Sequence, residues 1–73
     1  MNLILTTHAR QRMAQRNLTE QDIRAVLRHH HTSVPGAQPT TIRYRGRVRG
    51  RDLSVVAELP GVTADPVKVI TIY

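Results

Sequence analysis

The sequence predicts an α+β fold in which two N-terminal helices pack on one face of a three-stranded antiparallel sheet. Apolar residues recur at helical spacing in residues 8–31, whereas residues 42–59 alternate with a period of two. Residues 67–73 are rich in β-branched side chains, which favour strands. Because the chain has 73 residues and no internal repeat, we expect one domain over residues 1–73.

The first helix is predicted over residues 8–16. Thr6 and Thr7 precede it, and their hydroxyl groups can cap its first turn. Asn17 follows it and tolerates the left-handed conformation in which many helices end. The apolar residues 3–5 form either a short strand or a lead-in to this helix, and both alternatives remain open at this point.

The second helix is predicted to begin at Thr19. The spacing of Thr19 and Asp22 resembles a capping box, and Leu18 can pack on Ile23 as a hydrophobic staple. The helix ends in the basic residues 28–31, whose charge suits a helix C-terminus. One face of the helix carries the apolar residues expected in the core: Ile23, Val26 and Leu27.

A loop and then a β-hairpin follow the helices. Residues 32–39 contain serine, glycine and two prolines, so we expect a loop there. Residues 42–48 and 53–59 alternate between apolar and polar, as two strands of a half-buried hairpin do. Residues 49–50, Arg-Gly, predict the two-residue turn between them, because glycine adopts positive φ readily.

This turn predicts the register of the hairpin. Tyr44 opposes Val55 and Arg43 opposes Val56, so the apolar side chains of both strands lie on one face. Arg51 falls on the face of Tyr44. The other face carries a row of three arginines: Arg43, Arg45 and Arg47.

A second loop is predicted between residues 60–61 and 65–66, Pro-Gly and Asp-Pro. The chain then runs into a last strand over residues 67–73. This strand is apolar on both sides apart from Lys68 and Thr71, and such a strand is usually central or has its second face covered.

The charge of the chain favours polyanionic partners. Eleven Lys and Arg residues stand against five Asp and Glu, which gives a formal charge of +6 and a pI near 11.4. Ten of the eleven are arginine, whose planar guanidinium suits phosphate groups and stacks on bases. Nucleic acid is the commonest polyanion that such a field attracts. Codon usage or a solubility requirement offers a plainer explanation of the arginine content.

The composition also bears on cross-links that could stabilise the fold and on the cellular location of the protein. There is no cysteine, which excludes disulfides and thiolate metal sites, and so small a core leads us to expect a partner chain or a homodimer. The N-terminus lacks the features of a signal peptide, and no apolar run approaches transmembrane length. We therefore expect a cytoplasmic location and no membrane partner.

His8, Arg12 and Arg16 form one stripe along the first helix, because their spacing is i, i+4, i+8. An imidazole beside guanidinium groups suits phosphodiester chemistry, since the imidazole can move a proton while arginine holds the phosphate. The alternative is that His8 is only a capping or partly buried side chain.

The arginine row is the second candidate for RNA binding. Arg43, Arg45 and Arg47 are about 6.8 Å apart along their strand, close to the nucleotide spacing of an extended single strand. Bases could also stack on Tyr73. The alternative is a solvated strand face that prevents edge-to-edge aggregation.

Three consecutive histidines, residues 29–31, end the second helix. Adjacent residues of a helix end cannot all point at one metal ion, and no acidic residue lies near them in sequence. We therefore interpret the run as a solvated helix end, and we predict neither a metal site nor a cofactor.

The chain resembles a family of small bacterial proteins, domain of unknown function 4258. The resemblance rests on residues 7–16 (THARQRMAQR) and 18–23 (LTEQDI) in the first half. In the second half it rests on three further segments: residues 43–46 (RYRG), 50–53 (GRDL) and 69–73 (VITIY). These blocks occur in the same order and span nearly the whole chain.

The resemblance extends to toxins of the RelE and BrnT type, and it implies a metal-independent ribonuclease that an antitoxin neutralises. It implies catalytic roles for His8, Arg12 and Tyr73, and sheet-side roles for Arg51 and Thr71. The implied reaction is attack by the RNA 2′-hydroxyl on the adjacent phosphate, which leaves a 2′,3′-cyclic phosphate. His8 or Tyr73 would move protons, and the charged transition state would be stabilised by three arginines: Arg12, Arg43 and Arg51.

Two other functions remain open from the sequence. The same basic face would serve a nucleic-acid-binding module without catalysis, whose binding weakens steeply as salt rises. It would also serve an interaction protein whose arginines meet an acidic partner.

Overall fold

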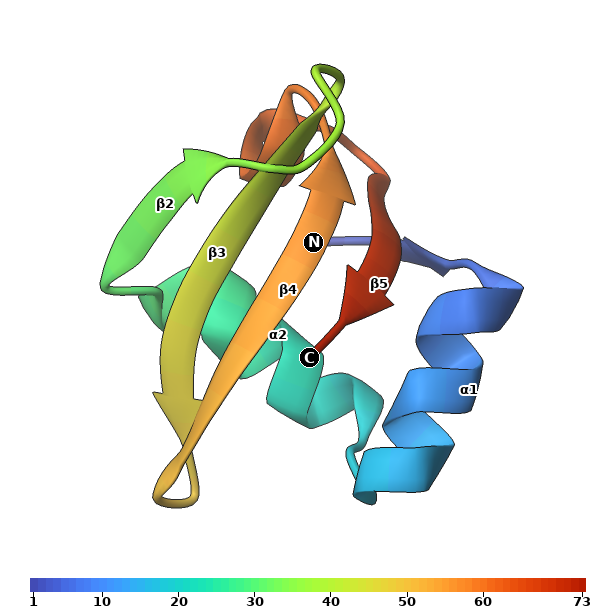
Figure 1. The fold of residues 1–73 in the computed structure, drawn as a ribbon, viewed down its shortest axis with the longest axis vertical. Coiled ribbons are helices and arrows are strands. Elements are labelled where there is room, and N and C mark those ends of the chain that lie inside the picture. Colours follow the sequence, from blue (N-terminus) through green and yellow to red (C-terminus); the bar gives the residue numbers. More distant parts are fainter.

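The computed structural model describes all residues, 1–73, as two helices and a five-stranded mixed sheet (Figure 1). The strand order is β1-β5-β4-β3-β2. The elements, in chain order, are β1 (Leu3–Leu5), α1 (Thr7–Arg16), α2 (Glu20–His29), β2 (Thr32–Pro35), β3 (Thr41–Val48), β4 (Arg51–Glu58), the 3₁₀ turn η1 (Gly61–Thr63) and β5 (Val67–Ile72).

The α+β class is confirmed, but the prediction of a three-stranded antiparallel sheet is wrong. A strand β2 lies where a loop was expected, and it pairs with the outer edge of β3. Its four residues are all exposed and end in a proline, so no alternation marks them as a strand. Of the two alternatives for residues 3–5, the strand is confirmed: they form β1, which pairs in parallel with β5.

Both helices are capped as predicted. The Thr6 hydroxyl accepts a hydrogen bond from the backbone N–H of Ala9, and Asn17 ends α1 with a φ of 56°. Thr19 and Asp22 form the reciprocal capping box of α2. The first helix begins one residue earlier than expected, which is the usual uncertainty of a helix end.

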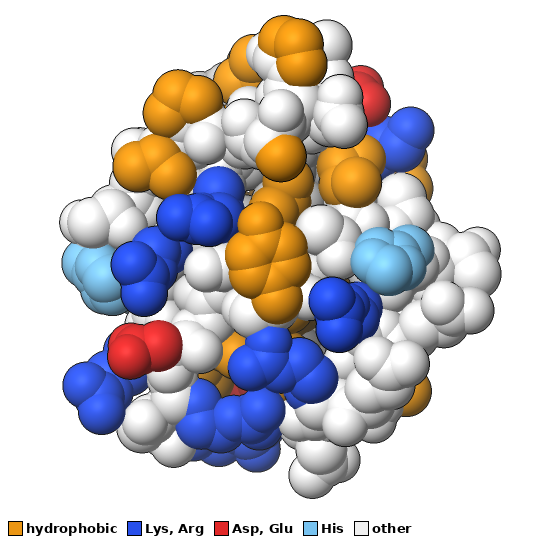
Figure 2. Space-filling model, viewed as in Figure 1, with side chains coloured by type: hydrophobic (Ala, Val, Ile, Leu, Met, Phe, Trp, Pro, Cys, Tyr) orange, Lys and Arg blue, Asp and Glu red, His pale blue; other side chains and the backbone are white.

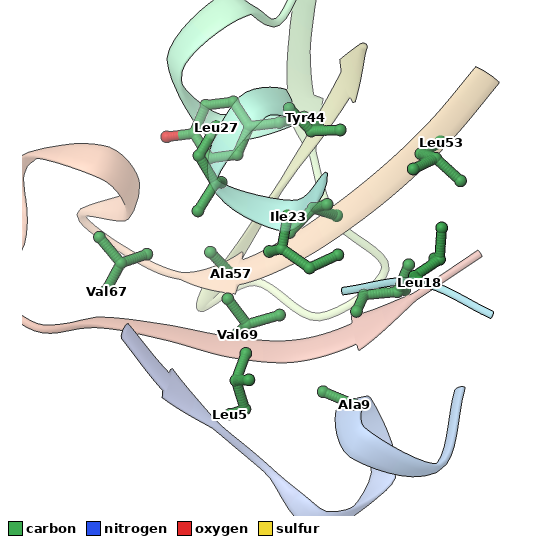
Figure 3. Close-up of a cluster of buried hydrophobic side chains, with 13 residues drawn as sticks. Leu5, Ala9, Leu18, Ile23, Leu27, Tyr44, Leu53, Ala57, Val67 and Val69 are labelled. Atoms are coloured by element: carbon green, nitrogen blue, oxygen red, sulfur yellow. The ribbon is translucent and has the colours of Figure 1, made fainter. Parts of the chain in front are cut away.

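The core lies between α2 and the sheet (Figure 3). Ile23, Val26 and Leu27 are buried and face β3 and β4, as the spacing predicted. Leu5 and Ala9 extend the core toward β5 and the edge strand β1, where α1 packs. The opposite face of the sheet has no helix over it (Figure 1).

The hairpin has the predicted register at every position, from Val48 opposite Arg51 to Ile42 opposite Ala57. Arg49 and Gly50 both have positive φ, 52° and 76°, which is the conformation of a type I′ turn. Two φ values of that sign match the twist of the paired strands, so the turn and the alternation specify one pairing.

The histidine run is not uniformly solvated, so that interpretation is wrong for His30. Its ring packs against the ring of Tyr44 with a centroid distance of 4.6 Å, and its Nδ1 lies 3.0 Å from the carbonyl oxygen of Leu27. Tyr44 points into the core because of the hairpin register, and the last turn of α2 lies across it.

The loop between β4 and β5 is attached to the core by Tyr44. The backbone N–H of Val62 donates a hydrogen bond of 3.0 Å to the Tyr44 hydroxyl. Gly61 lies against this hydroxyl with a φ of 75°. Each of the two helices has 10 residues, which is too short to span a membrane.

Asp22→Ala is expected to lower the free energy of unfolding by about 1–3 kcal/mol. Asp22 is 7% exposed, and its Oδ2 accepts bonds from the Thr19 N–H at 2.9 Å and from Arg49 Nη2 at 2.7 Å. It therefore joins α2 to the hairpin. Urea unfolding of the variant measures the loss.

Glu20→Ala is the control for Asp22→Ala. Glu20 lies in the same turn, but its only partner is Arg24, in an exposed pair of 3.0 Å. We expect a change below about 0.5 kcal/mol, because exposed i,i+4 pairs contribute little. Equal losses in the two variants would show that neither the Thr19 bond nor the Arg49 contact of Asp22 adds to the effect of an acidic residue in the first turn.

Candidate nucleic-acid interface

The candidate interface is the face of the sheet that no helix covers, here called the open face. Its residues lie in rows across the strands. Arg43, Val56 and Thr71 form one row. Arg45 and Ser54 begin the next row, and Tyr73 completes it by exchanging two backbone hydrogen bonds with Ser54.

A β-bulge in β5 brings Thr71 and Tyr73 to the open face. Val69 pairs with Ala57 and Thr71 with Val56, so one extra residue, Ile70, stands between the two pairs. Without it, a period of two would keep Thr71 on the core side together with Val69. The bulge instead buries Ile72 in the core and turns Thr71 and Tyr73 toward the arginine row.

The floor of the open face is buried although no helix packs on it. Val56 is 6% exposed and Ser54 is 9% exposed. The side chains that surround them are long, with the arginine row on one side and Tyr73 on the other. Aliphatic arginine stems can cover apolar surface while the guanidinium groups stay at the solvent. Tyr73 itself is 42% exposed, so its ring remains available for stacking.

The arginines of the open face are not neutralised. The three ion pairs of the protein involve other cations: Arg24 with Glu20, Arg49 with Asp22, and Lys68 with Glu58. Figure 2 shows the result: blue Lys and Arg side chains lie on both sides of a central hydrophobic group, and few red carboxylates are near. Such a concentration of unpaired guanidinium groups attracts polyanions.

The stripe of His8, Arg12 and Arg16 is present on α1. The core-facing positions of this helix are Ala9, which is fully buried, and Met13, which packs on the core. Arg12 and Arg16 are half-buried beside them, and His8 is exposed in the first turn. The helix packs on β5, the strand that carries Thr71. The structure therefore brings the two predicted sets, the stripe and the row, to neighbouring surfaces.

The family model described as domain of unknown function (DUF4258) matches residues 5–73. The chain belongs to this family. The match includes every predicted site residue of this DUF4258 protein. No curated protein and no solved structure gave a significant match.

Arg51 of the DUF4258 chain lies on the face of the sheet opposite the arginine row. It faces the helix side of the sheet, as the register predicted, and its Nη1 donates a hydrogen bond of 3.0 Å to the Arg16 carbonyl at the end of α1. Arg43 lies on the opposite face. The contact gives Arg51 a place at the C-terminus of α1, where a cation satisfies an unpaired carbonyl.

Sequence reasoning missed the buried floor of the interface, Ser54 and Val56. The predicted register placed Val56 opposite Arg43, so a signal was present, but it did not show that the position is buried. A hollow of about 310 Å³ lies elsewhere, and no predicted site residue lines it; its lining includes Val34, Pro35 and Leu59. The open face has no comparable cavity.

Proposed function

We propose that this DUF4258 protein binds single-stranded RNA on the open face and cleaves it without a metal ion, as a toxin-type ribonuclease. The observation that carries the proposal is the set of unneutralised arginines around the exposed ring of Tyr73, with His8 one helical turn from Arg12. Guanidinium groups bind phosphates, and an aromatic ring stacks an unpaired base.

In the proposed reaction the RNA 2′-hydroxyl attacks the adjacent phosphorus and the bond to the 5′-oxygen of the next nucleotide breaks. His8 or Tyr73 removes the proton of the 2′-hydroxyl or protonates the leaving oxygen. Arg12 and Arg43 stabilise the negative charge of the transition state. Because of its contact with Arg16, Arg51 has a positioning role in this proposal and does not touch the phosphate.

Arg16, Arg45 and Arg47 extend the RNA-binding surface beyond the reacting phosphate. The same proposal includes a relationship to RelE-type toxins and a cytoplasmic site of action. It also includes a neutralising antitoxin or other partner protein, and a homodimer. An acidic partner fits best, because β4 presents only two carboxylates on the open face, Asp52 and Glu58, and Glu58 is already paired with Lys68.

The test is incubation of the purified protein with mixed-sequence RNA in EDTA, followed by analysis of the product ends. We expect fragments that carry 2′,3′-cyclic phosphates, since the attacking group comes from the RNA itself. Products that end in 5′-phosphate, or activity that EDTA abolishes, would exclude this mechanism.

The second candidate is a nucleic-acid-binding module without catalysis. The observation that favours it is the freedom of His8, whose exposed ring has no hydrogen-bond partner in the protein to orient it. A general base is usually held by a third group. This candidate predicts intact RNA, and binding whose logarithmic salt slope is about −0.7 for each phosphate contacted.

A further inference from the structure

Three buried side-chain atoms of the protein have no hydrogen-bond partner: Arg12 Nε, Arg43 Nε and Thr71 Oγ1. Buried polar atoms are nearly always paired, because each one lost the hydrogen bonds that water offered. All three unpaired atoms belong to the open face and its α1 border. Such a coincidence calls for a common explanation.

Two of the three residues lie in one row of the interface, and the third lies on the helix that packs beside it. Arg43 and Thr71 flank Val56 in the same row of the sheet, from β3 on one side and β5 on the other. Arg12 comes from α1, which packs on β5. The Thr6 N–H and hydroxyl attach the start of this helix to the carbonyl groups of Val69 and Ile70, which directly precede Thr71.

All three atoms can donate a hydrogen bond, and two of them belong to cations. No carboxylate lies in their row. Glu58 is paired with Lys68, and Asp52 lies opposite Arg47, four residues along β3 from Arg43. A ligand that satisfies these donors must therefore bring acceptor oxygens and negative charge. Phosphate oxygens do both, and arginine and hydroxyl donors are well suited to them.

We propose that Arg12, Thr71 and Arg43 form an oxyanion site that holds one phosphodiester group of the RNA strand. The identity of this ligand rests on the proposed function, whereas the donor site itself does not. Tyr73 lies two residues from Thr71 on the same face, so a base next to the held phosphate can stack on its ring.

Thr71→Val tests the site, since valine keeps the shape of threonine and removes the hydroxyl. We expect about tenfold weaker binding of a 2′-O-methyl RNA hexamer, which cannot be cleaved, in fluorescence anisotropy. The affinity of the variant for inorganic phosphate should fall by a comparable factor. The NMR chemical shifts of residues 69–73 measure this binding. The Tm should rise by roughly 4–8 °C, because an unpaired buried hydroxyl is replaced by a methyl group.

Thr41→Val is the matched control. Thr41 is also buried, but its hydroxyl donates a hydrogen bond of 2.8 Å to the Gln38 carbonyl. This variant should have a lower Tm and unchanged hexamer affinity. A fall in Tm for Thr71→Val as well would mean that its hydroxyl is bonded in solution, and would overturn the site.

The outcomes separate this inference from the proposed function. Phosphate and hexamer binding that depend on Thr71, without cleavage of ordinary RNA, would support the site and reject the ribonuclease. Cleavage that is equally fast in Thr71→Val, with unchanged hexamer affinity, would reject the site and keep the ribonuclease. Thr71-dependent binding of poly-glutamate but not of the hexamer would overturn RNA as the ligand.

Discussion

His8→Ala is expected to slow RNA cleavage by about 10²- to 10⁴-fold, the range over which a positioned acid or base contributes. The side chain is exposed in the first turn of α1 and is not part of the core, so its removal should leave the fold intact. Affinity for uncleavable RNA should change by less than about twofold, because the arginines carry the charge. Single-turnover kinetics in EDTA measure the chemical step.

His29→Ala is the control for His8→Ala. His29 is an equally exposed histidine, but it ends α2, outside the predicted site. Its removal should leave the rate unchanged. Tyr73→Phe keeps the stacking ring and removes only the hydroxyl, so it separates proton transfer from binding. If His8→Ala and Tyr73→Phe combined in one chain cleave at the wild-type rate, the assigned mechanism is wrong.

Gly61→Ala is expected to be the most destabilising small substitution in the protein, with a loss of about 3–5 kcal/mol in the free energy of unfolding. A Cβ at Gly61 would overlap the Tyr44 hydroxyl and lie 3.1 Å from both Tyr44 Cζ and Ile42 Cγ2. The φ of 75° adds strain for any side chain. To avoid this overlap, Tyr44 would have to move, although it is a buried core residue that also accepts the Val62 hydrogen bond.

Gly50→Ala separates the two causes of this loss. Gly50 has nearly the same φ, 76°, but nothing lies within 4 Å of a Cβ built there. We expect a loss of about 1 kcal/mol from backbone strain alone. Chemical unfolding of both variants gives the difference. Equal losses would mean that the close contact with Tyr44 is absent in solution.

The local structure of this protein was predictable because its signals act between near neighbours. Thr6, Thr19 and Asp22 cap the backbone within three residues of their own positions, and Asn17 ends α1 by its own φ. The Arg49-Gly50 turn joins strands that are adjacent in sequence, so one turn specified every pair of the hairpin. The arginine row and its exposure on one face followed directly from this register.

The strands at both edges of the sheet were not predictable in this way. β2 has no apolar alternation, and it becomes a strand because the outer edge of β3 supplies backbone partners. β1 was only one of two alternatives, since its partner β5 lies at the other end of the chain. Pairing over such a separation leaves no pattern within either segment that identifies the other.

The sequence by itself determined the caps, the hairpin and the arginine row, because hydrogen bonds and side-chain alternation within a few residues suffice for them. Only the tertiary structure decided which predicted site residues share a surface. The bulge at Ile70 turns Thr71 and Tyr73 to the open face, whereas the hairpin register alone had already predicted that Arg51 lies on the helix side. The physical reason is that the face of a residue near an irregularity depends on which partner strand and helix it meets, and those partners are distant in sequence.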